Sequence, residues 1–284
     1  MAVSYLFQIP PRPARLELKN LYIFSVQYIQ RSSRRICLLK CVEVSKTFGG
    51  LQALKKVDFS VNDGDIAGLV GPNGSGKSTL LNIISGVYKP DSGKVLFNDK
   101  DIAKLPSHVI CARGIAKTSQ TVQSFPDMTT LQNVLIGVLF NEKKAKLKTS
   151  GVDQAAQLLE FVGLPKEKFQ SLAKELNVIE LRRVQLARAL ATKPKLLLLD
   201  ELLTGLTPKE TDEAIALVKL INKQGVTILM VEHVMKVIMG LCTHVTVLHH
   251  GEKICEGSPE KVCSDEEVIK VYLGKKFSVE DEGD

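Results

Sequence analysis

The sequence predicts an α/β fold with a parallel-sheet core, an antiparallel β layer and a helical insertion. An apolar run, 65–70, leads through a glycine-rich loop into a helical segment, which is a strand–loop–helix pattern. Apolar runs at 196–199 and 226–231 flank a helical segment at 208–224, as in a parallel β-α-β unit. Helical periodicity also dominates the middle of the chain, from about residue 126 to residue 190.

The antiparallel layer is predicted from short strands that alternate apolar and polar residues. Val57 to Val61 alternate strictly, and the strand 94–97 follows a Pro-Asp-Ser-Gly turn. A later hairpin is predicted from the strands 245–248 and 253–255, which turn at His249-His250-Gly251. The first two strands are expected to form this antiparallel layer.

A single domain is predicted to span residues 37–275, with a helical subdomain at about 126–190 inside it. Within that subdomain, apolar residues recur at helical spacing most clearly in 152–162 and 181–190. The strand pattern resumes only after residue 190, so the helical stretch is an insertion into the sheet domain.

The two ends of the chain carry opposite charge. Of the formal net charge of +7, most lies in residues 1–36, which hold six basic side chains against one acid, Glu17. We expect this arm to be a poorly ordered extension; the alternatives are a contact with anionic lipid or nucleic acid, or an arginine-rich transit segment. Residues 276–284 are expected to form an acidic, solvated tail.

The composition argues against a membrane-spanning protein and against a disulfide-stabilised one. The apolar runs at 196–199 and 226–231 are far shorter than the ~18 residues of a membrane-spanning helix, so none is predicted. The six cysteines include no C-x-x-C pair and have no histidine at zinc-ligand spacing. This pattern favours reduced cytosolic thiols over a disulfide framework.

Residues 71–79 contain the strongest functional motif, a complete G-x-x-x-x-G-K-[ST] phosphate loop. Its glycines allow backbone N–H groups to converge on a β-phosphate, and the following helix adds the partial positive charge of its N-terminus. Lys77 is expected to reach the β- and γ-phosphate oxygens, and the Ser78 hydroxyl to join the shell of a Mg²⁺ ion. The predicted nucleotide-binding residues of the loop are Gly71, Asn73, Gly74, Ser75, Gly76, Lys77, Ser78 and Thr79.

Two acids, Asp200 and Glu201, directly follow the apolar run 196–199. They lie at the distance from the phosphate loop that is expected for the second motif of a P-loop NTPase core. Asp200 would hold Mg²⁺ through its water shell, and Glu201 would accept a proton from the attacking water or orient it. The alternative is that both acids only cap the following helix. His233 follows the next strand at the same carboxyl edge of the sheet, so we expect it to reach the γ-phosphate.

These residues resemble those of the ABC ATPases, and the resemblance extends over residues 38–275. Phe48 matches the aromatic residue on which adenine stacks. Gln120 matches the glutamine that joins the Mg²⁺ shell and senses the membrane subunits, and His233 matches the switch histidine. Within the family, the segments around Phe48, Gln120, Gly205 and His233 are most similar to the branched-chain amino acid importers.

The resemblance implies an ATP-hydrolysing subunit that needs ATP and Mg²⁺ and lies at the inner face of the cell membrane. Its implied partners are a second ATPase subunit, integral membrane permeases and a periplasmic or extracellular substrate-binding protein, and no nucleic acid is expected. The implied cargo is branched-chain or other hydrophobic amino acids. Two alternatives stay open: a regulatory subunit without useful hydrolysis, and a soluble ABC ATPase with no role in transport.

The chain departs from the family at the signature motif, Leu-Ser-Gly-Gly-Gln, which acts on the ATP held by the opposite subunit. The aligned residues are Leu176 to Glu180, and β-branched Val178 and Ile179 cannot give the close backbone approach of glycine. Leu202 and Thr207 likewise replace the usual proline and Asp or Asn of a loop that crosses the dimer interface. A heterodimer with a standard partner would have one competent and one impaired site, whereas a homodimer would have two impaired sites. We therefore predict a heterodimeric importer ATPase, which is favoured, or a weakly active homologue.

Overall fold

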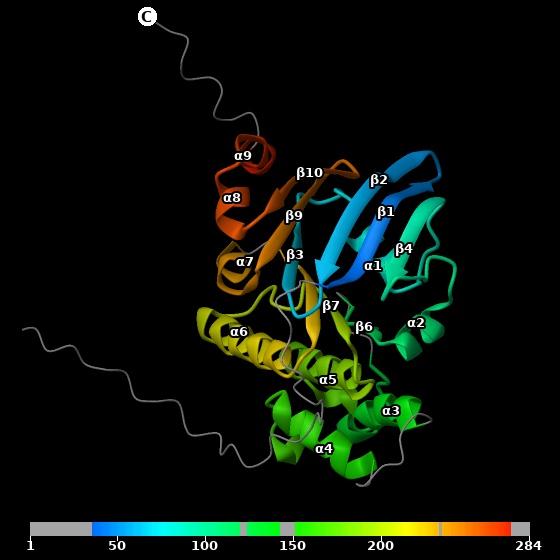
Figure 1. Ribbon diagram of the computed structural model, residues 1–284. Coiled ribbons are helices and arrows are strands. Elements are labelled where there is room, and N and C mark those ends of the chain that lie inside the picture. The colour runs from blue at the N-terminus through cyan, green and yellow to red at the C-terminus, as the bar shows by residue number, and fades with distance from the viewer. Residues whose placement is uncertain (1–35, 120–123, 143–150, 233–234, 274–284) are drawn as a thin grey trace, which may run out of the picture.

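The computed structural model describes residues 36–119, 124–142, 151–232 and 235–273, which form two β-sheets and the helices that cover them (Figure 1). The four-stranded sheet has the order β2-β1-β4-β5 and is antiparallel. The six-stranded sheet has the order β10-β9-β3-β8-β7-β6 and is parallel except for β10. The strands are β1 (Cys37–Phe48), β2 (Leu51–Asn62), β3 (Ile66–Val70), β4 (Ser92–Phe97), β5 (Lys100–Asp101), β6 (Ile115–Lys117), β7 (Leu196–Asp200), β8 (Thr227–Val231), β9 (His244–His249) and β10 (Glu252–Gly257).

The helices lie on both sides of the larger sheet. They are α1 (Lys77–Ile84), α2 (Ser107–Arg113), α3 (Thr130–Glu142), α4 (Gly151–Phe161), α5 (Val178–Ala191), α6 (Pro208–Lys223), α7 (Met235–Leu241), α8 (Pro259–Cys263) and α9 (Glu266–Leu273). No helix among these described residues is long and apolar enough to cross a membrane. The predicted α/β fold, with its antiparallel layer and its helical insertion, is confirmed.

The strands β3, β7 and β8 are buried along their whole length because helices or the second sheet cover both faces. Alternate residues of a strand point to opposite faces. Leu197 and Leu199 of β7 therefore join a core shared with α3, α4, α5 and α6, whereas Leu196 and Leu198 join a core shared with β1, β2 and α1. Burial on both faces explains why these strands are apolar runs in the sequence.

The helices α3, α4 and α5 gather at one end of the molecule, away from the antiparallel sheet (Figure 1). The helices α3 and α5 lie close enough that a Cβ atom added at Gly137 would be 2.5 Å from the carbonyl oxygen of Arg188. This contact requires glycine, and it fixes the helical region against the helix that leads back to the sheet.

The strand β1 was missed by sequence patterning because its alternation is interrupted. Its pairing with β2 shifts register between Cys41 and Val44, where Glu43 has a left-handed backbone with φ 47°. The N–H of Glu43 donates a hydrogen bond to Oδ1 of Asp58 at 3.0 Å instead of joining the ladder. A bulge of this kind disrupts the period-two pattern on which strand prediction depends.

Candidate nucleotide site

The phosphate loop joins β3 to α1 at the carboxyl edge of the six-stranded sheet. Gly71, Gly74 and Gly76 have positive φ angles of 146°, 76° and 106°, which L side chains rarely adopt. A Cβ atom would lie 2.1 Å from the carbonyl oxygen of Leu248 if added at Gly71, and 2.6 Å from that of Ala53 if added at Gly76. The loop therefore forms a cradle that only glycine permits.

The cradle opens onto the start of α1. Gly76 is the N-cap and provides no side-chain cap, so the first N–H groups of the helix can bind a phosphate. Ser78 and Thr79 follow in the first turn, while Asn73 and Gly74 are exposed in the loop. The predicted residues of the motif thus lie together, in a local geometry that fits the phosphates of a nucleotide.

The turn between β9 and β10 supports this loop from the side. The N–H of Gly251 donates to the carbonyl oxygen of Ser75 at 3.1 Å, and the carbonyl oxygen of Gly251 accepts from the N–H of Lys55 at 2.8 Å. Ser75 is itself buried. The hairpin turn predicted at 249–251 therefore connects the phosphate loop to β2, a role that its sequence did not indicate.

Lys77 lies within the loop, and only 8% of it is exposed. Its Nζ donates to the carbonyl oxygens of Gly71 at 2.7 Å and Pro72 at 2.8 Å. Burial lowers the pKa of Lys77, and the carboxylates of Glu201 and Asp200 oppose that shift. The ammonium group, the phosphate loop, the predicted metal-binding Asp200 and the predicted catalytic Glu201 therefore share one electrostatic environment.

Asp200 ends β7 and is almost fully buried, with 4% of its surface exposed. Its Oδ2 lies 3.2 Å from Nζ of Lys117, whereas its Oδ1 is buried and has no hydrogen-bond partner. An unpaired buried carboxylate oxygen is costly unless another group compensates its charge. The orphaned oxygen fits a water molecule of a Mg²⁺ shell, as predicted for Asp200.

The oxygen donors near the phosphate loop are compatible with Mg²⁺. In the part of the chain that the structure describes, no group of three His, Cys, Asp or Glu residues could hold a metal ion. Mg²⁺ commonly binds through one or two protein oxygens, several waters and substrate phosphates. Ser78 and Asp200 supply oxygens of this kind.

Lys117 is a candidate functional residue that the sequence interpretation did not single out. It ends β6, the neighbour of β7, and its Nζ lies 2.6 Å from Oδ1 of Asn82 as well as 3.2 Å from Asp200. The next residue, Thr118, accepts a hydrogen bond from the N–H of Asp200 at 3.4 Å. The signal available in the sequence was a basic residue three positions before Gln120.

Glu201 follows β7 directly and is half-buried. Its backbone is left-handed, with φ 50°, and its N–H donates to the carbonyl oxygen of Val231 at 3.0 Å. A non-glycine residue in this region of φ is uncommon and often marks a functional position. The turn places Glu201 beside Asp200, at the edge where β8 also ends.

Gln120 and His233 lie outside the described residues, so their predicted roles stay predictions. The residues on their N-terminal sides, Ser119 and Glu232, do lie at the carboxyl edge of the sheet. The buried amide of Gln185 on α5 faces the backbone of Ser119. When the amide is oriented with its nitrogen toward the carbonyl oxygen of Ser119, that nitrogen donates to this oxygen at 3.2 Å. The amide oxygen then accepts from the N–H of Ser119 at 2.9 Å. The segment before Gln120 is thereby joined to α5.

Glu232 is a second functional candidate that sequence patterning missed. It is 1% exposed, and its Oε1 accepts a hydrogen bond from the N–H of Leu203 at 2.9 Å, while its Oε2 is buried without a partner. Burial raises the pKa of Glu232 to about 7. This carboxyl group links the end of β8 to the loop that follows Glu201.

Phe48 ends β1 and is 38% exposed. Its ring contacts the ring of Tyr88 edge to face, with centroids 5.2 Å apart, and Nζ of Lys46 lies 5.4 Å from its centroid. The exposed ring can accept a flat heterocycle. This geometry is compatible with the predicted role of Phe48 in stacking on adenine.

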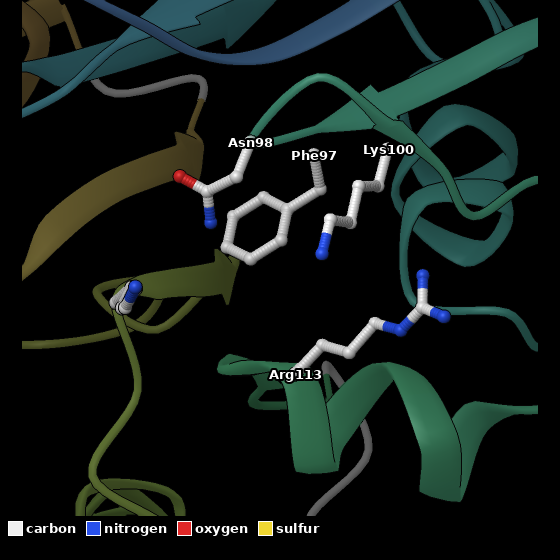
Figure 2. A pocket seen from close by; sticks show the side chains of 5 residues that line it. Phe97, Asn98, Lys100 and Arg113 are labelled. Atoms are coloured by element: carbon white, nitrogen blue, oxygen red, sulfur yellow. The ribbon is translucent and has the colours of Figure 1, made fainter.

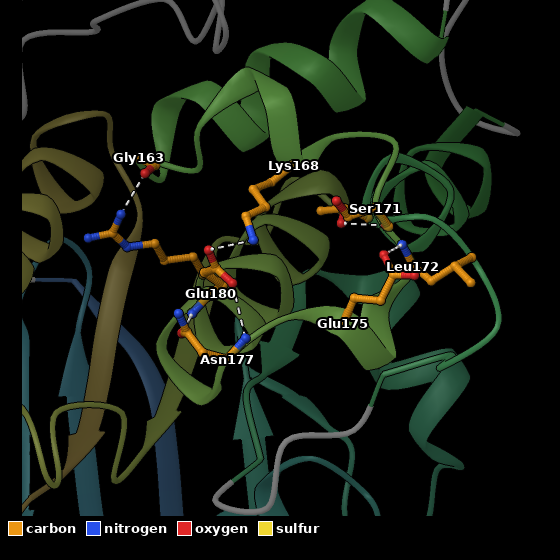
Figure 3. A network of polar contacts seen from close by, with 9 residues as sticks. Gly163, Lys168, Ser171, Leu172, Glu175, Asn177 and Glu180 are labelled. Carbon is orange, nitrogen blue, oxygen red and sulfur yellow. Dashed lines mark hydrogen bonds and ion pairs between the residues drawn. The ribbon is translucent and has the colours of Figure 1, made fainter.

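The altered signature forms a closed helix cap (Figure 3). Asn177 is the N-cap of α5; its Oδ1 accepts from the N–H of Glu180 at 2.9 Å, and its own N–H donates to Oε2 of Glu180 at 3.0 Å. The Glu180 carboxylate also lies 3.5 Å from Nζ of Lys168, and Val178 is 59% exposed. Side chains of the protein itself therefore occupy the N-terminus of this helix.

The fold and the site define a phosphate-loop nucleotide-binding protein. Comparisons with known proteins identify the family: residues 54–204 match the model of the ABC transporter family, and residues 252–278 match that of the branched-chain amino acid ATP-binding cassette transporters. The chain belongs to the ABC transporter family, as an ATP-binding cassette.

The similar proteins include transport subunits and solved cassettes. The high-affinity branched-chain amino acid transport ATP-binding protein BraF of Pseudomonas aeruginosa is 34% identical over 251 residues, which are 84% of this chain and 98% of the relative. The LivG protein of Escherichia coli K12, of the same description, is 36% identical over 241 residues, 80% of this chain and 94% of the relative. The ADP conformation of an ATP-binding cassette of an ABC transporter superposes with a TM-score of 0.73 at 33% identity, covering 84% of this chain and 99% of that one.

Proposed function

We propose that this chain is the ATP-hydrolysing subunit of an importer of branched-chain or other hydrophobic amino acids. The observation that carries the proposal is the arrangement of Lys77, Asp200 and Glu201 around the glycine cradle at one edge of the sheet. The named relatives are transport ATP-binding proteins for branched-chain amino acids. Because an ATPase subunit need not contact the cargo, the substrate follows from the relatives and not from this site.

Each predicted residue has a distinct role in this proposal. Lys77 and the loop N–H groups bind the phosphates, and the exposed ring of Phe48 stacks on adenine. Ser78, Asp200 and Gln120 hold the waters and oxygens around Mg²⁺, which would neutralise charge on the β- and γ-phosphates. Glu201 orients the attacking water or accepts its proton, and His233 contacts the γ-phosphate.

A heterodimer is the assembly that the signature supports. In the family, the signature serine and glycines bind the γ-phosphate held by the other subunit. Here the Asn177–Glu180 cap satisfies the N-terminus of α5 and places a carboxylate where an anion would bind. Like charges repel, so this surface would disfavour a phosphate. A partner with an intact signature would complete the site of this chain.

The proposed partners follow from the same assignment. They are a second ATPase, integral membrane permeases and a periplasmic or extracellular substrate-binding protein. The chain would lie peripherally on the inner face of the membrane, held by the permeases. The alternative of a regulatory subunit is supported by the closed α5 cap, and it predicts that Glu201→Gln leaves transport by the assembled complex unchanged.

Calorimetric titration with Mg-ATP tests the nucleotide assignment. The purified chain should bind ATP with a dissociation constant of about 1–100 μM, equivalent to about 5–8 kcal/mol, and Lys77→Ala should weaken binding by at least about tenfold. Lys219→Ala, on the exposed face of α6, is the matched control and should leave the affinity unchanged. Absence of ATP binding by folded wild-type protein would overturn the proposal.

A further inference from the structure

A cavity of about 330 Å³ lies at the amino edge of the six-stranded sheet (Figure 2). Its lining residues are Phe97, Asn98, Lys100, Arg113 and Lys195, and we call it the basic cavity. Lys195 immediately precedes β7, whereas Asp200 is the last residue of that strand. At ~3.3 Å per residue, a strand of this length places the basic cavity about 16 Å from the catalytic edge. It is therefore separate from the nucleotide site.

The basic cavity gathers cations from three segments that are distant in sequence. Lys100 comes from the β4–β5 hairpin, Arg113 from the end of α2, and Lys195 from the residue before β7. Figure 2 shows Lys100 and Arg113 extending into the same space from opposite sides. An adjoining hollow of about 170 Å³ shares Arg113 and Lys195 and adds Lys193. Like charges brought together in this way repel each other.

None of these cations forms an ion pair with an acid of the described chain, although Asp99 and Asp101 flank Lys100 in the sequence. No carboxylate lines either hollow, and no ion pair joins Lys100, Arg113 or Lys195 to an acidic side chain among residues that the structure describes. Elsewhere in the described chain, some basic side chains do form ion pairs; for example, Nζ of Lys46 lies 2.7 Å from Oδ1 of Asp91. What distinguishes the basic cavity is that three such cations line one hollow.

The backbone holds these cations in a defined arrangement. The carbonyl oxygen of Gly114 accepts from the N–H groups of Lys195 at 2.8 Å and Leu196 at 3.0 Å, which fixes the end of α2 to the start of β7. The N–H of Asn98 donates to the carbonyl oxygen of Leu38 at 3.0 Å, which fixes the hairpin to β1. A ligand bound here would order side chains but no backbone, which lowers the entropic cost of binding.

We propose that the basic cavity binds a multiply charged, phosphate-bearing anion. The guanidinium of Arg113 matches a phosphate in a bidentate fashion, the ammonium groups of Lys100 and Lys195 supply point charges, and the amide of Asn98 adds a neutral donor. A phosphate monoester carries three acceptor oxygens and close to two negative charges, so it balances three cations better than a carboxylate, which carries one negative charge. The phosphate can belong to a soluble metabolite or to a lipid headgroup.

The competing explanation is that these cations only complement helix ends. Arg113 is in the last turn of α2, and Lys193 and Lys195 follow the end of α5, where the partial negative charge of a helix favours cations. That role requires no ligand and predicts no saturable binding. The two explanations therefore differ in whether an added phosphate compound binds saturably to the basic cavity.

Titration with sodium pyrophosphate separates them. The full chain carries Lys77→Ala, which weakens binding at the phosphate loop, and calorimetry is done at about 50 mM NaCl, where surface charge is little screened. One saturable site is expected, and Arg113→Gln with Lys195→Gln should weaken it by at least about tenfold. The control variant, Lys219→Gln with Lys223→Gln, removes the same charge from the exposed face of α6 and should change the affinity less than about twofold.

Vesicles of phosphatidylcholine with and without phosphatidylglycerol test the lipid source by co-sedimentation. If pyrophosphate binding is weakened by the Arg113→Gln and Lys195→Gln pair, with or without an effect on vesicle binding, the ligand includes soluble phosphates. If only vesicle binding is weakened by this pair, the ligand is a lipid headgroup. Each of these results supports the anion site. Equal behaviour of the pair variant and the α6 control in both arms would overturn it.

Discussion

At the residue scale, the ion pair between Lys117 and Asp200 has the clearest energetic consequence. Both groups are largely buried, with 15% and 5% of their side chains exposed. In Lys117→Met the stem is kept but the charge is lost, which leaves a buried carboxylate without its counter-ion. We expect a loss of about 2–4 kcal/mol in the free energy of unfolding of the nucleotide-free chain.

Urea denaturation with and without Mg-ATP tests this expectation. The metal ion near Asp200 would partly replace the missing ammonium, so Mg-ATP should stabilise Lys117→Met more than wild type, by about 1 kcal/mol or more. Lys117→Arg, which keeps the charge, is the matched control and should lose less. If Mg-ATP stabilises all three proteins equally, Lys117 does not act on the metal site.

A second residue-scale prediction concerns pH and Glu232. Its pKa in the folded chain is raised to about 7 from an ordinary value of 4.5, so between these values the folded chain binds a proton that the unfolded chain has lost. Stability contributed by this group is therefore present at low pH and is lost as pH rises toward 8. Glu232→Gln should remove this loss, which is of the order of 3–4 kcal/mol at ~1.4 kcal/mol per pKa unit.

Urea denaturation of wild type and Glu232→Gln at pH 5 and pH 8 measures the effect. The stability of the variant relative to wild type should increase from the lower to the higher pH. Glu252→Gln, on the exposed face of β10, is the control and should follow the wild-type curve apart from the loss of a surface ion pair. Parallel curves for wild type and Glu232→Gln would show that burial of this carboxyl group does not shift its titration.

At the element scale, apolar periodicity in the sequence predicts some strands and helices of the structure but not others. The buried strands β3, β7 and β8 are apolar runs, and the capped helix α6 shows helical periods, so both were predictable. The bulged strand β1 was not, because its register shifts interrupt the alternation. The phosphate loop was complete in the sequence, but the contact of Lys117 with Asp200 depends on the pairing of β6 with β7, which no local pattern records.

The helix α5 provides the prediction at this scale. Its capping box pairs Asn177 with Glu180, and such caps contribute roughly 1 kcal/mol. Asn177→Ala should therefore lower the free energy of unfolding by about 1 kcal/mol, whereas Asn177→Ser, which keeps a capping oxygen, should be nearly neutral. Urea denaturation measures both. If the two variants lose equal stability, the side-chain cap is not what stabilises the start of α5.

At the scale of the whole molecule, the proposed heterodimer would use the catalytic residues of this chain in one ATP site and its altered signature in the other, so we expect activity to depend on the partner. The chain alone should hydrolyse ATP at least about tenfold more slowly than a mixture with a related cassette of intact signature. In the mixture, Glu201→Gln of this chain should abolish the stimulated rate. Replacing residues 177–180 by Ser-Gly-Gly-Gln should raise the rate of the chain alone, at some cost to the stability of α5. Rapid turnover by the unmodified chain without any partner would contradict the heterodimer and assign the Asn177–Glu180 cap a structural role only.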